Sequence, residues 1–325
     1  MDGRSDGDDH GDRACDEDGT GICLTSHGRS LRSGQMTALC FLAVHFGQVY
    51  GNMKGDRMSR DKRAIFVFYG VVLFLSLIVE LLYIRIVNTL FLVLLMWIPG
   101  IVGMICSKAF YGEEGSLGFA VKVKPRYLVL GILIPAVYLV GSYCIAWAVL
   151  GDPANGVDSE SLLRSVAAFL PGLLGSTLTA AGEEIGWRGF AFPVLEREFG
   201  RRKAVLVNGF IWALWHVPLI IGGVYQSAVN PVYGIVSFMV MVMLIAVIFC
   251  WSRSVSGSVI PAILLHASHN HIDQRYLQPM STDPRVPYFA GEQGMITIVI
   301  TAVIAAVVVR HWKKQDHAEK LGLCK

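Results

Sequence analysis

Eight long apolar blocks follow residue 63 and restrict what this chain can fold into. They cover roughly residues 64–86, 89–107, 127–150, 171–197, 203–222, 232–251, 256–272 and 293–310. A helix needs about 20 apolar residues to cross a hydrocarbon core about 30 Å thick, and all but the seventh block approach that length. The chain is 54% hydrophobic and 16% charged, whereas soluble proteins carry about 25% charged residues. We therefore predict an all-α fold, a polytopic transmembrane helical bundle of about eight spans.

The loops between these blocks alternate between many and few basic residues. The basic positions are Arg60, Lys62 and Arg63, then Lys108, Lys122, Lys124 and Arg126, then Arg197, Arg201, Arg202 and Lys203, then Arg253, and finally Arg310, Lys313 and Lys314. Basic residues favour cytoplasmic loops, so an even number of spans predicts a multi-pass protein with both termini in the cytoplasm. The formal net charge of +3 is too small to indicate a nucleic-acid partner, and membrane lipids are the expected surroundings.

The chain divides by composition into three parts. Residues 1–33 are rich in Asp, Gly, Arg and Ser and cannot bury enough apolar surface to fold, so 1–57 is predicted to be a disordered extension. One hypothesis is that translation begins near Met53 or Met58, which would make this extension an artefact. Residues 58–315 form the predicted transmembrane domain, with a motif core at 160–275, and 316–325 form a predicted cytoplasmic tail.

Three of the apolar blocks carry polar residues, which are costly in a membrane and therefore mark a candidate site. These residues are Glu183, Glu184 and Arg188 in block 171–197, His216 in block 203–222, and His266 and Asn270 in block 256–272. If the first two blocks form a hairpin turning near Gly200, Glu183 and His216 each lie about 20–25 Å from the turn, at 1.5 Å per residue. His266 lies about 20 Å beyond Arg253, so the three side chains reach nearly the same depth.

Helical spacing predicts which of these side chains face each other. Asn270 follows His266 by one turn and shares its face, and Glu184 and Arg188 can pair in the same way. Glu183 points about 100° away from Glu184 and is free to face the site.

Such a group suits the activation of water. A glutamate in a water-poor pocket can act as general base, and a histidine can carry the proton to the leaving amine. A second histidine and an amide can donate hydrogen bonds to the oxyanion of a tetrahedral intermediate. The same residues can instead hold a metal that activates the water, with Glu183, His216 and His266 as the candidate ligands.

The order and spacing of these residues resemble the CAAX prenyl protease type II family, also called the CPBP or Abi family of intramembrane proteases. That family carries EExxxR, FxxxH and HxxxN or HxxxD motifs on separate helices. The corresponding residues here are Glu183, Glu184 and Arg188, then Trp212 and His216, then His266 and Asn270. Trp212 stands where the family has Phe, and we expect it to form a wall of the pocket.

The resemblance implies a role for each residue. Glu183 would be the general base, assisted by His216, while His266 and Asn270 would stabilise the oxyanion. Glu184 and Arg188 would support the site or orient the substrate. Family members have been described both as metalloproteases and as metal-independent glutamate proteases, so the resemblance leaves open whether a divalent metal such as zinc takes part.

The leading hypothesis is an intramembrane endopeptidase that hydrolyses a membrane-associated or lipidated, CAAX-type substrate. The alternatives are a catalytically idle membrane scaffold or bacteriocin-immunity protein, and a proton-coupled transporter. Other intramembrane polar residues have simpler explanations. Glu80 is expected to pair with Arg85 or a lipid headgroup, and His269 and His271 are expected near the membrane interface.

Overall fold

The computed structural model describes residues 58–112, 115–120, 122–152 and 159–320. The predicted extension at 1–57 lies outside these ranges. The predicted tail starts within the last helix, and residues 321–325 lie outside the described part of the chain.

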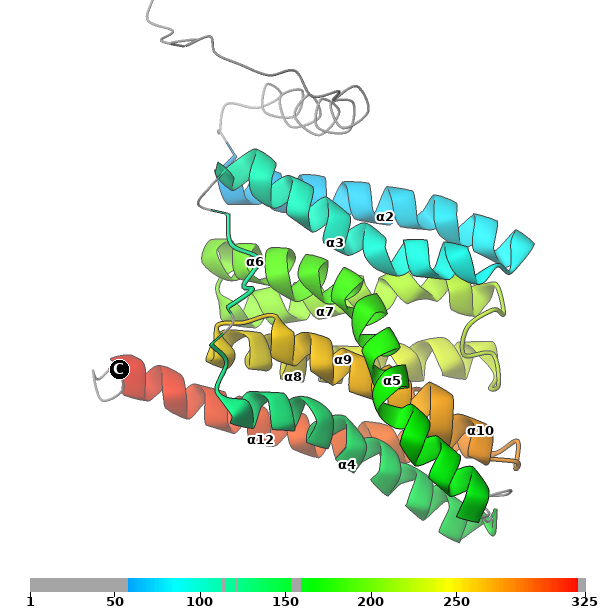
Figure 1. Ribbon diagram of the computed structural model, residues 1–325. Helices are drawn as coiled ribbons and strands as arrows, with labels where there is room; N and C mark the ends of the chain where they lie inside the picture. The colour runs from blue at the N-terminus through cyan, green and yellow to red at the C-terminus, as the bar shows by residue number, and fades with distance from the viewer. Residues whose placement is uncertain (1–57, 113–114, 121, 153–158, 321–325) are drawn as a thin grey trace, which may run out of the picture.

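Helices make up the secondary structure of the described ranges, where no strand occurs, so the all-α prediction is confirmed there. The elements are α2 (Arg60–Ile86), α3 (Thr89–Tyr111), α4 (Pro125–Leu150), α5 (Ser159–Glu184), the π-helical turn η2 (Ile185–Ala191), α6 (Phe192–Phe199), α7 (Arg201–Ile221), α8 (Pro231–Ser256), α9 (Ile260–Ile272), the π-helical turn η3 (Asp273–Leu277), α10 (Gln278–Met280), α11 (Val286–Phe289) and α12 (Met295–Lys320). The long helices lie roughly side by side, while α5 runs obliquely across them (Figure 1).

Six helices of the described chain are long and apolar enough to cross a membrane, namely α2, α3, α4, α7, α8 and α12. The predicted number of about eight is therefore only partly confirmed. The other two apolar blocks are helical, but α9 has 13 residues, too few for a full crossing. The fourth block is divided between α5, η2 and α6 and carries charged residues. Its helix begins at Ser159, before the predicted start at residue 171.

The outer surface of the bundle is apolar, as expected for helices that face lipid. Large side chains such as Phe74, Leu90 and Val232 are 65%, 71% and 73% exposed along the candidate spans. The protein is a multi-pass integral membrane protein, and its buried polar residues must find their partners inside the bundle.

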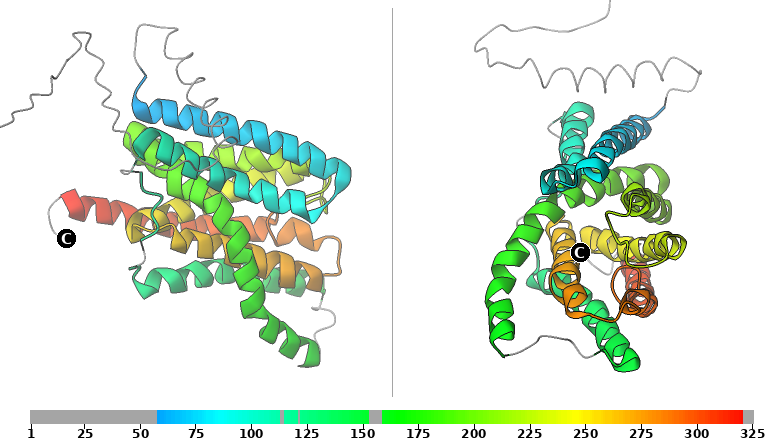
Figure 2. Two further views of the ribbon diagram at one scale, coloured as in Figure 1. Left: turned by 45° about the horizontal axis from the view of Figure 1, so that its top comes forward. Right: turned by 90° about the vertical axis from the view of Figure 1, so that its right-hand side faces the viewer.

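The predicted hairpin at Gly200 is confirmed. Helix α6 ends at Phe199, Gly200 adopts a positive φ of 77°, and α7 begins at Arg201. Glycine enters this backbone region without steric cost, so the chain reverses within a single residue. Figure 2 shows α7 returning alongside α6, and the two helices pack together.

A close approach of α3 to α5 and η2 sets the position of the motif residues. A Cβ atom on Gly182 would lie 2.6 Å from the Met96 carbonyl oxygen, and one on Gly186 would lie 2.4 Å from the Pro99 carbonyl carbon. Only glycine fits at such distances. The backbone on both sides of Glu183 and Glu184 therefore packs directly on α3.

Candidate active site

Glu183 and Glu184 occupy the last turn of α5, just before η2, and both side chains are buried. Successive residues on a helix point about 100° apart, so the two carboxylates meet different partners. A π-helical turn inside a helix is rare and is frequently found at functional sites. Here it follows directly on the glutamate pair and carries Arg188.

Glu184 joins two of the three motif segments. Its Oε1 accepts hydrogen bonds from Arg188 Nη1 at 3.0 Å and from His266 Nδ1 at 2.9 Å. The Arg188 guanidinium is fully buried and lies 3.9 Å from the centre of the Trp212 ring. The predicted pair between Glu184 and Arg188 is therefore confirmed. The bond to His266, which sequence spacing did not predict, places Glu184 next to the site itself.

These contacts fix the orientation of His266. A carboxylate paired with arginine only accepts hydrogen bonds, so His266 Nδ1 is the donor and Nε2 carries the lone pair in the neutral ring. Nε2 lies 4.0 Å from Glu183 Oε1. That separation is too long for a hydrogen bond and can be bridged by one water molecule.

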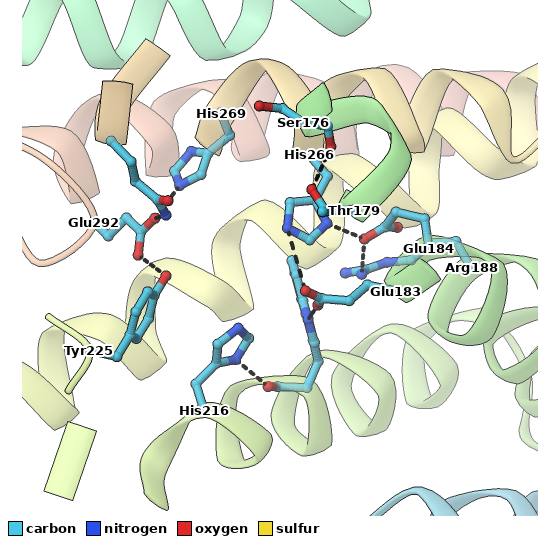
Figure 3. A network of polar contacts seen from close by, with 12 residues as sticks. Ser176, Thr179, Glu183, Glu184, Arg188, His216, Tyr225, His266, His269 and Glu292 are labelled. Atoms are coloured by element: carbon cyan, nitrogen blue, oxygen red, sulfur yellow. Dashed lines mark hydrogen bonds and ion pairs between the residues drawn. The ribbon is translucent and has the colours of Figure 1, made fainter. Parts of the chain in front are cut away.

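Glu183 has one fixed oxygen and one that faces His266. Its Oε2 accepts a hydrogen bond from the Trp212 indole at 2.9 Å, while Oε1 is the atom nearest His266 (Figure 3). Trp212 thus forms the predicted wall of the pocket and also orients the carboxylate of Glu183. The second function depends on the indole N–H, which the family's usual Phe lacks.

His216 approaches the same pocket from α7. Its Nδ1 lies 2.9 Å from the Trp212 carbonyl oxygen, and since a carbonyl only accepts, Nδ1 is the donor. Nε2 of the neutral ring is left as an acceptor. Trp212 therefore links the two candidate catalytic residues, because its indole N–H bonds to Glu183 and its backbone carbonyl accepts from His216.

The motif residues border one cavity of about 90 Å³, which has room for a few water molecules. Glu183, Trp212, His216, His266 and Asn270 all line it. Asn270 is half-buried, and its side-chain amide makes no hydrogen bond to another described residue. The remaining wall is largely apolar and includes side chains of α3 and α8. The arrangement can hold water against a carboxylate beside an apolar surface.

The three candidate metal ligands do not form a preassembled cluster. Within the described ranges, no group of three or more His, Cys, Asp or Glu residues lies close enough to hold a metal ion. The acceptor atoms of Glu183, His216 and His266 are nevertheless of the kind that zinc binds. Removal of metal by a chelator tests whether these three side chains bind zinc.

A second buried polar group, not predicted from the sequence, lines the same cavity. Its centre is Glu292, between α11 and α12, with Tyr225, His269 and Gln274 around it. His269 and His271 are both buried in the bundle, and His271 Nε2 bonds to the Phe169 carbonyl oxygen. Their expected place near the membrane interface stays a prediction. The sequence feature that could have pointed to Glu292 is an isolated acidic residue between Gly291 and Gly294, at the start of the last apolar block.

The expected partner of Glu80 is not observed. Its side chain is buried, and it makes no hydrogen bond or ion pair within the described part of the chain. The proposed partner Arg85 is exposed. The Arg85 alternative is wrong because Glu80 faces the α7 side of α2, where it borders an apolar cavity between the two helices. The alternative of a lipid headgroup stays a prediction.

Comparison with known proteins identifies the family. Residues 165–272 match the family model described as "Type II CAAX prenyl endopeptidase Rce1-like". The chain is also 30% identical over 203 residues to "CAAX prenyl protease 2" of Methanococcus maripaludis, across 60% of this chain and 68% of that protein. The chain belongs to the type II CAAX prenyl endopeptidase family. The segment matched to the family model contains every motif residue from Glu183 to Asn270 but not Glu292.

Membership in this family of membrane proteases is consistent with the geometry. In this chain the three motifs lie on α5 with η2, on α7 and on α9, all within the segment that matches the family model. Their side chains converge on one cavity although Glu183 and Asn270 lie 87 positions apart. The catalytic roles of the individual residues stay predictions.

Proposed function

We propose that this protein is an intramembrane endopeptidase in which Glu183 activates a water molecule to hydrolyse a peptide bond. One observation carries the proposal. The Trp212 indole fixes one oxygen of the buried Glu183 carboxylate, while the other oxygen lies 4.0 Å from His266 Nε2 across the cavity. That gap suits a single water hydrogen-bonded to both groups.

The reaction follows from these positions. Glu183 takes a proton from the water, and the water oxygen attacks the carbonyl carbon of the peptide bond. The resulting oxyanion accepts a hydrogen bond from the Asn270 amide. It accepts a second one from His266 Nε2 when that imidazole is already protonated before the attack, with its charge stabilised by Glu184. His216 assists in passing the proton to the amine nitrogen as the C–N bond breaks. The products are a carboxylate and an amine, and no covalent bond forms between enzyme and substrate.

We propose that the substrate is a lipidated C-terminal peptide of the CAAX type. The relative from Methanococcus maripaludis is named a CAAX prenyl protease. The apolar cavity wall beside Glu183 supports an apolar group near the cleaved bond. A lipid anchor would also concentrate the peptide at the membrane, where the cavity lies.

The experiment compares wild type, Glu183→Gln and His216→Ala, purified in detergent, against a peptide library that includes lipidated C-termini. Glu80→Gln is the matched control, because it changes a buried membrane glutamate that lies outside the cavity. Cleavage is read by mass spectrometry with and without chelator. We expect loss of a general base to slow cleavage about 10²–10⁴-fold in Glu183→Gln, with Glu80→Gln close to wild type.

Each other outcome has a defined meaning. Loss of wild-type activity with chelator would assign the water activation to a metal held by Glu183, His216 and His266. No cleavage by well-folded wild type would contradict the proposal and favour an idle scaffold or immunity protein.

We also propose that both termini are cytoplasmic. The basic residues of the loops gather at one end of the bundle, where Arg197 pairs with Asp61 at 3.0 Å and Arg201 lies over the Trp312 ring. Cysteine substitutions at exposed Arg202 and exposed Ser227 would be labelled from opposite sides of the membrane in intact cells. Labelling of residue 202 from outside would contradict this orientation.

A further inference from the structure

Glu292 is a buried carboxylate at the far side of the cavity from Glu183. It lies between α11 and α12 and is 3% exposed. Four side chains donate hydrogen bonds to it. Oε2 accepts from Tyr225 Oη at 2.5 Å and Gln226 Nε2 at 2.9 Å, and Oε1 accepts from His269 Nε2 at 3.3 Å and Gln274 Nε2 at 3.0 Å.

The four donors come from three separate parts of the chain. Tyr225 and Gln226 lie in the loop between α7 and α8, His269 lies on α9, and Gln274 lies in η3. His269 also extends the network to α4, because its Nδ1 lies 2.7 Å from the Tyr138 hydroxyl. One carboxylate therefore ties the α7–α8 loop to the helix that carries His266.

Ionisation of Glu292 strengthens the hydrogen bonds that join the α7–α8 loop to α9. Burial raises the pKa of Glu292, but the hydrogen bonds from His269, Tyr225 and Gln274 outweigh burial and lower it below the usual value for a glutamate. Hydrogen bonds to a charged acceptor are roughly twice as strong as neutral ones. The network therefore holds the side chains around Glu292 in fixed positions.

The loop that Glu292 holds is strained and lies against His216. Gln226 has a positive φ of 50°, a conformation that non-glycine residues seldom adopt. Its side-chain amide donates a hydrogen bond to Glu292. The neighbouring Tyr225 ring is stacked on the His216 ring, with centroids 5.9 Å apart and planes inclined by 26° (Figure 3). Phe238 packs edge-on against both rings.

We infer that Glu292 is a positioning residue for His216 and acts through Tyr225. The inference rests on the proposed function, which gives His216 its role in proton transfer. Tyr225 covers one face of the imidazole, and the Trp212 carbonyl oxygen holds Nδ1 at 2.9 Å. Together these two contacts fix the orientation of the His216 ring and therefore the position of its Nε2 atom at the cavity. Without the Glu292 carboxylate, the strained loop relaxes and the Tyr225 ring leaves the face of His216.

The test uses two variants that keep side-chain size. Glu292→Gln replaces one acceptor oxygen by an N–H₂ group, which cannot accept the bonds now made there. Tyr225→Phe keeps the ring but removes the hydroxyl that reaches Glu292. Glu80→Gln is the matched control, since Glu80 is also a buried glutamate but has no hydrogen-bond partner among the described residues.

Two measurements are made on each full-length variant in detergent. One is kcat and KM for a lipidated peptide that wild type cleaves. The other is the NMR spectrum of protein labelled at histidine Cε1, with the His216 signal assigned by its loss in His216→Gln. We expect both variants to lower kcat about 10–100-fold, the effect of a small misplacement in a catalytic group, with KM changed less than about threefold. We also expect the His216 signal to move while the signal of exposed His311 stays in place.

Wild-type kcat and an unmoved His216 signal in Glu292→Gln would overturn the inference. So would a shift of every histidine signal with loss of thermal stability, because that pattern means general unfolding. If wild type cleaves no peptide, the proposed function fails separately, and the NMR comparison still decides whether Glu292 positions His216.

Discussion

Arg188 and Glu184 show how individual residues depend on one another in this site. Both side chains are fully buried and paired at 3.0 Å, and the guanidinium stacks on Trp212, whose indole in turn bonds to Glu183. Removing one partner of a buried ion pair leaves the other charge without compensation. The pair therefore supports the position of Glu183 as well as the stability of the helix.

Arg188→Met tests this at the residue scale. We expect the free energy of unfolding to fall by about 3–5 kcal/mol, because Glu184 is left buried and unpaired by arginine. Arg197→Met is the control, since its pair with Asp61 is partly exposed, and such pairs contribute about 0–1 kcal/mol. Thermal unfolding in detergent measures both. An equal loss of unfolding free energy in the two variants would contradict the claim that burial makes the Arg188–Glu184 pair the stronger contribution.

At the scale of elements, the contact between α3 and α5 determines where the glutamate pair lies. Gly182 immediately precedes Glu183, and a Cβ atom there would meet the Met96 carbonyl oxygen at 2.6 Å. Gly175, on the same helix, has open space around it. The two glycines thus share a helix but differ in what surrounds them.

Alanine substitution at the two positions is expected to act in opposite directions. Gly182→Ala should cost about 1–3 kcal/mol, because α3 and α5 must separate to admit the methyl group. Gly175→Ala should be neutral or stabilise by up to about 1 kcal/mol, since alanine favours helix. Unfolding midpoints of the two variants against wild type measure the difference. Destabilisation by Gly175→Ala alone would contradict the close contact.

The end of α4 gives a prediction on pH. Asp152 accepts hydrogen bonds from the Thr282 hydroxyl and from the backbone N–H groups of Thr282 and Asp283. These bonds lower the pKa of Asp152, with a smaller opposing effect from burial and from the charge of Asp283. Because the folded state holds the charged form, its stabilisation is present above the usual pKa of about 3.9 and is lost as pH falls below it.

Wild type and Asp152→Asn should therefore differ in thermal midpoint by a constant amount between pH 7 and about pH 5. The difference should shrink as the pH falls below about 4. Midpoints measured in one detergent across this range provide the test. A difference that grows on acidification would mean that Asp152 is protonated in the folded protein.

For the molecule as a whole, the sequence predicts the bundle well because hydropathy reports directly on lipid exposure. The blocks that became α2, α3, α4, α7, α8 and α12 are long and apolar. The depth of Glu183, His216 and His266 also followed from the rise per residue of a helix, which explains why these residues line one cavity. Helical periodicity likewise predicted the pair of Glu184 with Arg188.

Other features depend on tertiary packing and escaped prediction. The oblique course of α5 and the turn η2 depend on glycine contacts with α3, which no local pattern records. The bond from His266 to Glu184 joins residues that lie 82 positions apart. Glu292 was missed because it lies between helices, where a constant rise per residue does not predict depth.

The central claim is that a water molecule held by Glu183 attacks the peptide bond directly. Its most direct test is cleavage of a lipidated peptide in ¹⁸O-labelled water with hydroxylamine present, analysed by mass spectrometry. The account predicts one ¹⁸O atom in the new carboxylate, no hydroxamate product, and cleavage by Glu183→Gln slowed about 10²–10⁴-fold. A hydroxamate product would reveal a covalent acyl-enzyme, and undiminished cleavage by Glu183→Gln would assign the water to another group. Either result would contradict the account.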